Sequence, residues 1–204
     1  MKNFVCVLCI LFIGISNNVF AEKLEVIDTK NEFGGITAVV TYSSGDQFYK
    51  TGIEKLIGYL DGNKKMVKLE NIFTDRFASQ HLKAKTIEHY DHSENNIVKF
   101  EEFYTHQYSK LFGVAKQITY HDSNEKTVKI EKFYTAAWTK KKGITKNVIY
   151  NDSKGRMVKK EEFKTDEGAG KNGIVKKIEF YDGKGKPVRS ENYDQNGKLV
   201  KILP

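Results

Sequence analysis

One frame of residues recurs about every 30 positions along the chain, and this periodicity restricts the folds that are open to it. An aspartate marks each copy, at Asp61, Asp91, Asp122, Asp152 and Asp182. The sixth residue before the aspartate is always lysine, the fourth is isoleucine or valine, and the second is a ring residue. Such a frame predicts a repeat protein, in which neighbouring units supply the burial that a single unit lacks.

Spacings of two residues within the frame predict β-strands, because side chains on a strand alternate between its faces. In the last copy, Ile174, Lys176, Ile178 and Phe180 fall on one face of the first arm. The segment Asp-Gly-Lys-Gly at 182–185 then supplies residue types that favour a turn. We therefore predict an all-β fold, an antiparallel meander of about five β-hairpin repeats of about 30 residues, as an open curved sheet or a half barrel.

Each copy also carries a lysine in its first arm and a glutamate in its second arm. The lysines are Lys55, Lys85, Lys116, Lys146 and Lys176, and the glutamates are Glu70, Glu101, Glu131, Glu161 and Glu191. We expect the lysine of one arm to form a cross-strand ion pair with the glutamate of the other. An exposed pair stabilises by no more than about 1 kcal/mol, so its role would be to fix the register of the strands.

The segment 1–21 has the layout of a secretory signal peptide. Lys2 supplies a positive start, the run from Val5 to Ile15 is almost entirely apolar, and Ala21 provides a small residue at the cleavage site. The run is shorter than the roughly 20 residues of a membrane-spanning helix, which disfavours permanent anchoring. We predict export to the periplasm or the extracellular space, an N-terminal cap with a shortened leading unit at 22–51, and a repeat array at 52–201 that ends in a C-terminal cap.

Both cysteines of the chain, Cys6 and Cys9, lie in this leading segment. The mature chain would therefore have no disulfide, no cysteine-ligated zinc and no cysteine nucleophile. A lipidated Cys9 is the alternative interpretation, but Val7 and Leu8 lack the small residue expected ahead of such a cysteine.

The chain is basic, with a formal net charge of +8. Such a charge suits acidic partners such as anionic glycans or lipid headgroups. Export disfavours nucleic acid, and the positive charges are spread along the repeats instead of forming a run, which is also typical of a solvated surface.

The last two turns resemble a known pattern. The residues concerned are Tyr181-Asp182, Gly185-Lys186 and Val188-Arg189, followed by Tyr193-Asp194, Gly197-Lys198 and Val200-Lys201. They are similar to the tyrosine-aspartate (YD) repeats of bacterial Rhs-type shell proteins and to the related MORN-type hairpin repeats. Upstream, Tyr-Asp gives way to other pairs such as Asn151-Asp152, and the step is longer than in those families. The resemblance implies a hairpin array used as a scaffold, shell or interaction surface, and it carries over no catalytic residue.

The sequence favours neither a metal site nor an active site. The histidines gather in the second and third repeats, at His81, His89, His92, His106 and His121. A zinc or copper site is conceivable there, but His89 and His121 occupy positions of the frame that other copies fill with ring or polar residues. Calcium is disfavoured because the turns are basic. The acids recur identically from repeat to repeat, whereas catalytic groups are usually singular, so we predict no cofactor, no metal and no enzyme.

The segments that join the repeats differ from copy to copy, and we predict that they are loops that bind the ligand. Rings and lysines gather in two of them, at Tyr108, Lys110, Phe112, Trp138, Lys140 and Lys141. Such residues suit an anionic glycan or an envelope protein; alternatively, the rings only close the edge of the core. The leading hypothesis is an exported, non-enzymatic binding or scaffold protein of the cell envelope. The alternatives are an inhibitory or protective partner of an exported toxin and a small extracytoplasmic hydrolase.

Overall fold

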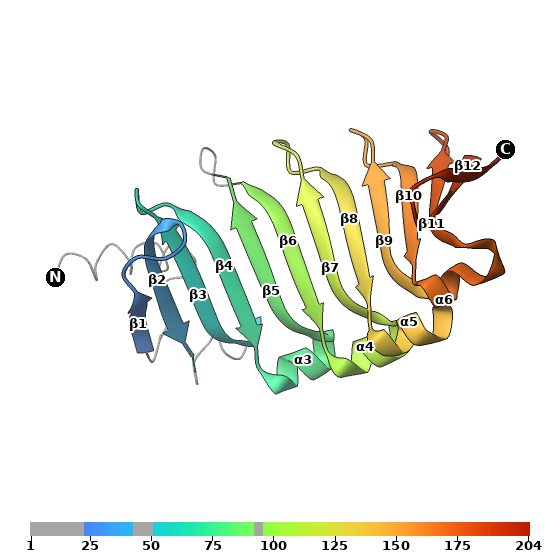
Figure 1. Ribbon diagram of the computed structural model, residues 1–204. Helices are drawn as coiled ribbons and strands as arrows, with labels where there is room; N and C mark the ends of the chain where they lie inside the picture. Colours follow the sequence, from blue (N-terminus) through green and yellow to red (C-terminus); the bar gives the residue numbers. More distant parts are fainter. Residues whose placement is uncertain (1–22, 43–50, 92–95) are drawn as a thin grey trace.

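A computed structural model describes residues 23–42, 51–91 and 96–204, and it shows a single open β-sheet (Figure 1). Short helices lie along the side of the sheet opposite the hairpin turns, where one hairpin is joined to the next; we call this side the helical edge. The sheet has 13 strands in chain order, and each strand pairs antiparallel with the next. The predicted all-β hairpin meander is confirmed, and its form is the open sheet. The predicted signal peptide lies outside the described residues.

Five hairpins, β3–β4 to β11–β12, correspond to the five copies of the frame, and β1, β2 and β13 flank them. The strands are β1 (Lys23–Asp28), β2 (Gly34–Thr41), β3 (Ile53–Asp61), β4 (Met66–Phe73), β5 (Lys83–Tyr90), β6 (Ile97–Tyr104), β7 (Val114–His121), β8 (Thr127–Tyr134), β9 (Ile144–Asn151), β10 (Met157–Lys164), β11 (Ile174–Tyr181), β12 (Pro187–Asp194) and β13 (Leu199–Leu203). The helices are α3 (Asp75–His81), α4 (His106–Phe112), α5 (Ala136–Lys142), α6 (Asp166–Ala169) and the 3-10 helix η1 (Gly170–Asn172). No helix in the described ranges is long and apolar enough to cross a membrane.

The repeated aspartate holds the turn of its hairpin. In the fourth repeat, Asp152 Oδ1 accepts hydrogen bonds from the backbone N–H groups of Lys154 at 2.9 Å and Arg156 at 3.0 Å. Gly155 takes the left-handed conformation that the turn requires, with φ of 76°. The same pair of bonds forms at Asp61, Asp122, Asp182 and Asp194. The aspartate therefore acts locally, as an acceptor for backbone amides.

The segments between the hairpins are short helices, so the prediction of loops was wrong. A threonine precedes each helix from α3 to α6 and caps it: the Thr135 side chain accepts a hydrogen bond from Trp138 N at 3.2 Å. Gly143 then ends α5 in the left-handed conformation, with φ of 69°. Seven residues between these two signals are enough for two turns of helix, which the strand-like spacing of the rest of the frame does not reveal.

The repeated ion pair joins successive hairpins instead of closing one hairpin. Lys85 Nζ lies 3.2 Å from Oε2 of Glu70, which belongs to the preceding repeat. The same contact links Lys116 to Glu101, Lys146 to Glu131 and Lys176 to Glu161. The predicted pairing within a hairpin is therefore corrected. In the register of the sheet, each glutamate lies diagonal to a lysine on both sides, and the twist of the strands brings one of these diagonals closer.

Hydrophobic clusters of buried residues lie at the N-terminal end of the sheet. Ala38 packs with Leu60 in one cluster, and Val40, Tyr42 and Leu56 form a second. Further along the sheet, the buried aliphatic residues of the strands are Val114 and four residues that share one position of the frame, Ile87, Ile118, Val148 and Ile178. Over most of its length the sheet is thus a single layer, in which each strand is covered by the side chains of its neighbours.

Candidate functional site

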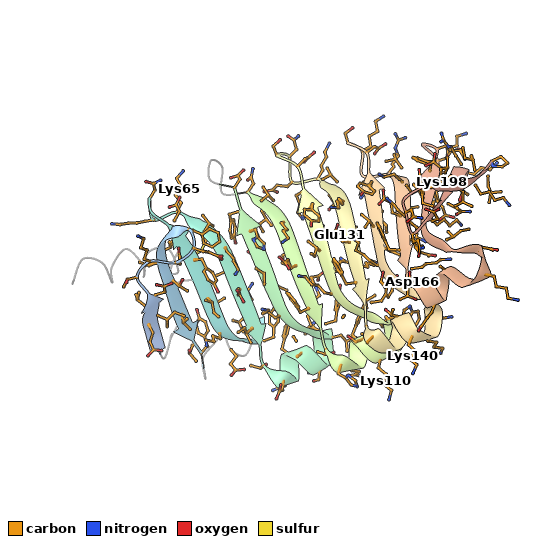
Figure 2. The ribbon with its side chains drawn as sticks, viewed as in Figure 1. Lys65, Lys110, Glu131, Lys140, Asp166 and Lys198 are labelled. Carbon is orange, nitrogen blue, oxygen red and sulfur yellow. The ribbon has the colours of Figure 1, made fainter. Side chains whose placement is uncertain are left out.

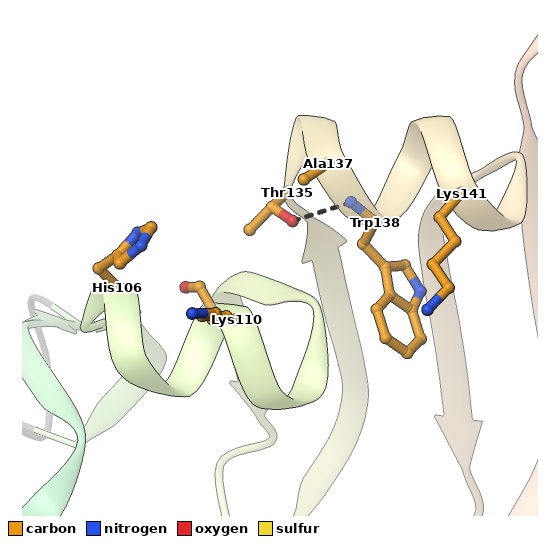
Figure 3. A pocket seen from close by; sticks show the side chains of 7 residues that line it. His106, Lys110, Thr135, Ala137, Trp138 and Lys141 are labelled. Atoms are coloured by element: carbon orange, nitrogen blue, oxygen red, sulfur yellow. Dashed lines mark hydrogen bonds between the residues drawn. The ribbon is translucent and has the colours of Figure 1, made fainter.

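A groove lies on the helical edge of the sheet, between α4 and α5 (Figure 3). Its volume is about 380 Å³, and its lining residues are His106, Ser109, Lys110, Thr135, Ala137, Trp138 and Lys141. The edge is separate from the glutamates of the sheet: Figure 2 shows Glu131 among the strands, whereas Lys110 and Lys140 lie on the helices.

The wall of the groove that α5 contributes is positioned by Trp138, the only tryptophan of the chain. Its ring stacks on Tyr134 at a centroid distance of 6.2 Å and an interplanar angle of 14°. Its indole also covers Gly113, where an added Cβ would lie 2.1 Å from Trp138 Cδ2. Gly113 ends α4 with φ of 77°, so one glycine both terminates the first helix and makes room for the ring of the second.

The two helices that border the groove are basic. Neither α4 nor α5 contains an acidic residue, and together they carry Lys110, Lys140, Lys141 and Lys142. The neighbouring helices differ, because α3 begins with Asp75 and α6 with Asp166 and Glu167. Lys110, Lys141 and His106 are exposed and Trp138 is half-buried, so a ligand would meet cations beside an aromatic ring.

The structure brings three of the six predicted site residues, Lys110, Trp138 and Lys141, to this groove. The other three do not line it. Tyr108 stacks on Tyr104 at a centroid distance of 4.1 Å, and its ring centre lies 4.6 Å from that of Phe112. Phe112 is 53% exposed beside it, and Lys140 lies in the last turn of α5.

The sequence interpretation missed His106, Ser109, Thr135 and Ala137. The capping threonine was visible as a constant of the frame, and a seven-residue span from it to the next glycine could have indicated two adjacent helices with a groove between them. Ser109 Oγ donates to Val114 O at 2.9 Å, and Thr135 Oγ1 accepts from Trp138 N. Both hydroxyls therefore have protein partners. Lys110, Lys141, His106 and the part of the indole that Tyr134, Gly113 and Lys142 leave uncovered remain for a ligand.

The histidines in the sheet take positions of the frame. His89 stands where other repeats have tyrosine or phenylalanine, and its Nε2 lies 2.8 Å from Oε1 of Glu101. Tyr120 makes the corresponding bond to Glu131 at 3.3 Å. Within the described ranges, no group of three or more histidine, cysteine, aspartate or glutamate residues is arranged to hold a metal ion.

Comparisons with known proteins do not assign a family to the chain. No protein-family model and no curated protein matches it. Among solved structures, the chain is similar to S. aureus TarM, both to a variant in complex with fondaparinux, alpha-GlcNAc-glycerol and UDP and to TarM in a second structure. Each match has 18% identity and a TM-score of 0.22, and it covers 63% of this chain and 21% of TarM. A TM-score this low carries no argument, and the resemblance to YD and MORN repeats stays a prediction.

Proposed function

We propose that the protein is an exported, non-enzymatic binding or scaffold protein of the cell envelope, whose ligand binds in the groove between α4 and α5. The observation that supports this most strongly is the combination of Trp138 with lysines from two helices that contain no acid. Export rests on the signal-peptide layout of the sequence.

The groove favours an anionic ligand with a flat, partly apolar body, such as an acidic sugar. A sugar ring can pack on an indole through its C–H face, while Lys110 and Lys141 on either side contact its anionic groups. The repeats would serve as a scaffold, because they fix both helices at one edge through the caps and through the contact of Trp138 with Gly113.

Tryptophan fluorescence provides the test, since Trp138 is the only tryptophan and lies in the groove. We expect titration with oligogalacturonate to change the emission of Trp138, and neutral cello-oligosaccharides of equal length to change it much less. The double variant K110Q/K141Q should weaken the binding of oligogalacturonate about tenfold, because two exposed charge contacts together contribute on the order of 1.4 kcal/mol.

The matched control is K140Q/K171Q, which removes the same charge from lysines outside the groove. It should bind oligogalacturonate as the parent protein does. Unchanged emission together with no binding of oligogalacturonate by calorimetry would refute the proposal, as would an equal loss of affinity in both double variants.

A further inference from the structure

One face of the sheet carries three parallel ladders of side chains that run across the strands. We call it the ladder face. The upper ladder, nearest the hairpin turns, alternates rings with cations. The middle ladder alternates aliphatic residues with glutamates. The lower ladder, nearest the helices, alternates lysines with apolar, mostly aromatic residues. In the third hairpin the three cross-strand pairs are Tyr120–Lys129, Ile118–Glu131 and Lys116–Phe133.

Every hairpin adds two cations and one glutamate to the ladder face, so the positive charge grows with each repeat. The cations of the upper ladder are Lys68, Lys99, Lys129, Lys159 and Arg189, and those of the lower ladder are Lys55, Lys85, Lys116, Lys146 and Lys176. The glutamates between them are buried: Glu101 is 6% exposed, whereas the side chain of Lys99 is 30% exposed. A molecule lying on this face would therefore meet ammonium groups before it met carboxylates.

The rings of the ladder face form two rows with the same period as the charges. In the lower row, Phe103, Phe133, Phe163 and Tyr193 stand on every second strand, which sets a spacing of about 10 Å. The rings are half-buried, and Lys146 Nζ lies 4.8 Å from the centre of the Phe163 ring. Between Phe163 and Tyr193 the face is hollowed to a volume of about 460 Å³, with Lys176 in the lining.

The opposite face lacks this excess of positive charge. In its central positions, between the outermost cross-strand partners, the lysines are Lys132, Lys160, Lys177 and Lys201, and the acids are Glu88, Glu102, Glu162 and Glu179, so the charges of these described residues balance. Lys83 and Lys164, at the ends of their strands, form ion pairs with Glu102 and Glu162. The excess of positive charge is thus larger on the ladder face, although lysines occur on both faces.

We propose that the ladder face binds a linear anionic polysaccharide that lies across the strands, along the rows of rings. The charge of the face is complementary to such a polymer, since each step of about 10 Å offers one net positive charge and a ring on which a sugar can pack. The period favours an extended chain over a compact ligand. This surface is separate from the groove between α4 and α5 and does not depend on it.

The test uses two double variants with the same change in net charge on the same two strands. Lys129 and Lys159 belong to the ladder face. When Lys129 is replaced, Glu131 keeps its ion pair with Lys146. When Lys159 is replaced, Glu161 keeps its ion pair with Lys176. Lys132 and Lys160 lie on the opposite face, and Lys160 matches Lys159 in side-chain exposure, at 30% each. We expect K129Q/K159Q to weaken binding to immobilised dextran sulfate about tenfold and K132Q/K160Q to leave it nearly unchanged.

Polymer length and chemistry complete the test. Affinity should rise with the length of the dextran sulfate chains, because a longer chain reaches more repeats of the same protein molecule and these contacts strengthen one another. Unsulfated dextran should bind far more weakly. Thermal melts identify any variant that is unfolded; for such a variant, replacing the lysines with arginine should restore binding. Equal losses in the two double variants, no dependence on length, or tighter binding of single-stranded DNA than of dextran sulfate would overturn the proposal. The groove variant K110Q/K141Q should bind dextran sulfate as the parent protein does, which would show that dextran sulfate does not bind at the groove between α4 and α5.

Discussion

Glu101 shows what the ladder face requires of a single residue. Burial by itself would raise the pKa of its carboxyl, but hydrogen bonds from Lys116, Lys99 and His89 outweigh this and lower the pKa from 4.5 to about 2. The folded-state pKa lies below the unfolded value, so the ionised carboxylate stabilises the fold above pH 4.5. This contribution is lost as the pH falls from 4.5 towards 2.

We therefore expect Glu101→Gln to lower the free energy of unfolding at neutral pH by about 1–2 kcal/mol and to flatten its dependence on pH in that acidic window. Urea denaturation of both proteins at neutral and acidic pH measures the two effects. Glu125→Gln is the matched control, because Glu125 is exposed in the turn between β7 and β8. A pH dependence in the Glu101 variant equal to that of the parent would contradict this account.

At the scale of the element, the helical edge depends on Gly113, which ends α4 and accepts the ring of Trp138 from α5. Gly113 and Gly155 have almost the same φ, 77° and 76°. A Cβ at Gly155 would meet nothing within 4 Å, whereas one at Gly113 would meet the indole of Trp138 at 2.1 Å. Gly155→Ala should therefore cost only the left-handed backbone penalty of about 1–2 kcal/mol.

Gly113→Ala should cost more than Gly155→Ala by about 1–3 kcal/mol, because the indole must move. It should also shift the emission maximum of Trp138, which Gly155→Ala leaves unchanged. Thermal and urea melts give the stabilities, and fluorescence of the native proteins reports on the ring. Equal costs and identical spectra would mean that Trp138 does not depend on this contact.

The sequence predicted the elements whose signals are local and left undecided those that depend on the sheet. Strands and turns followed from spacings of two and from Asp152 and its counterparts, which act within five residues of chain. The helices also had local signals, Thr135 and Gly143, but the variable residues between them resembled loops. The partner of Glu70 could not be read from the sequence, since Lys55 and Lys85 occupy equivalent diagonals and only the twist of the sheet distinguishes them. Three residues that line the groove, Lys110, Trp138 and Lys141, were among the predicted site residues, because rings and lysines gather in these segments of the sequence.

At the scale of the whole molecule, the sheet behaves as a one-dimensional array. The elements with substantial contact are neighbours in the chain, so stability is expected to be a sum of hairpins and their interfaces. Burial is uneven along the array: clusters of buried residues support β2 and β3 at the N-terminal end, whereas Leu199, Val200 and Ile202 of β13 are exposed. Local opening should therefore be graded from one end to the other.

Native-state hydrogen exchange followed by mass spectrometry should reveal this gradient. We expect the slowest exchange in β2 to β4, where Ala38 and Leu60 pack together, and the fastest in β13, which pairs only with β12 among the described strands. The free energy of opening should decrease stepwise from hairpin to hairpin towards β13, because each hairpin contacts only its two neighbours and can open without disturbing more distant hairpins. A uniform opening energy across all strands would show that the array unfolds as one cooperative unit, in which case the ladders would couple hairpins over the full width of the sheet.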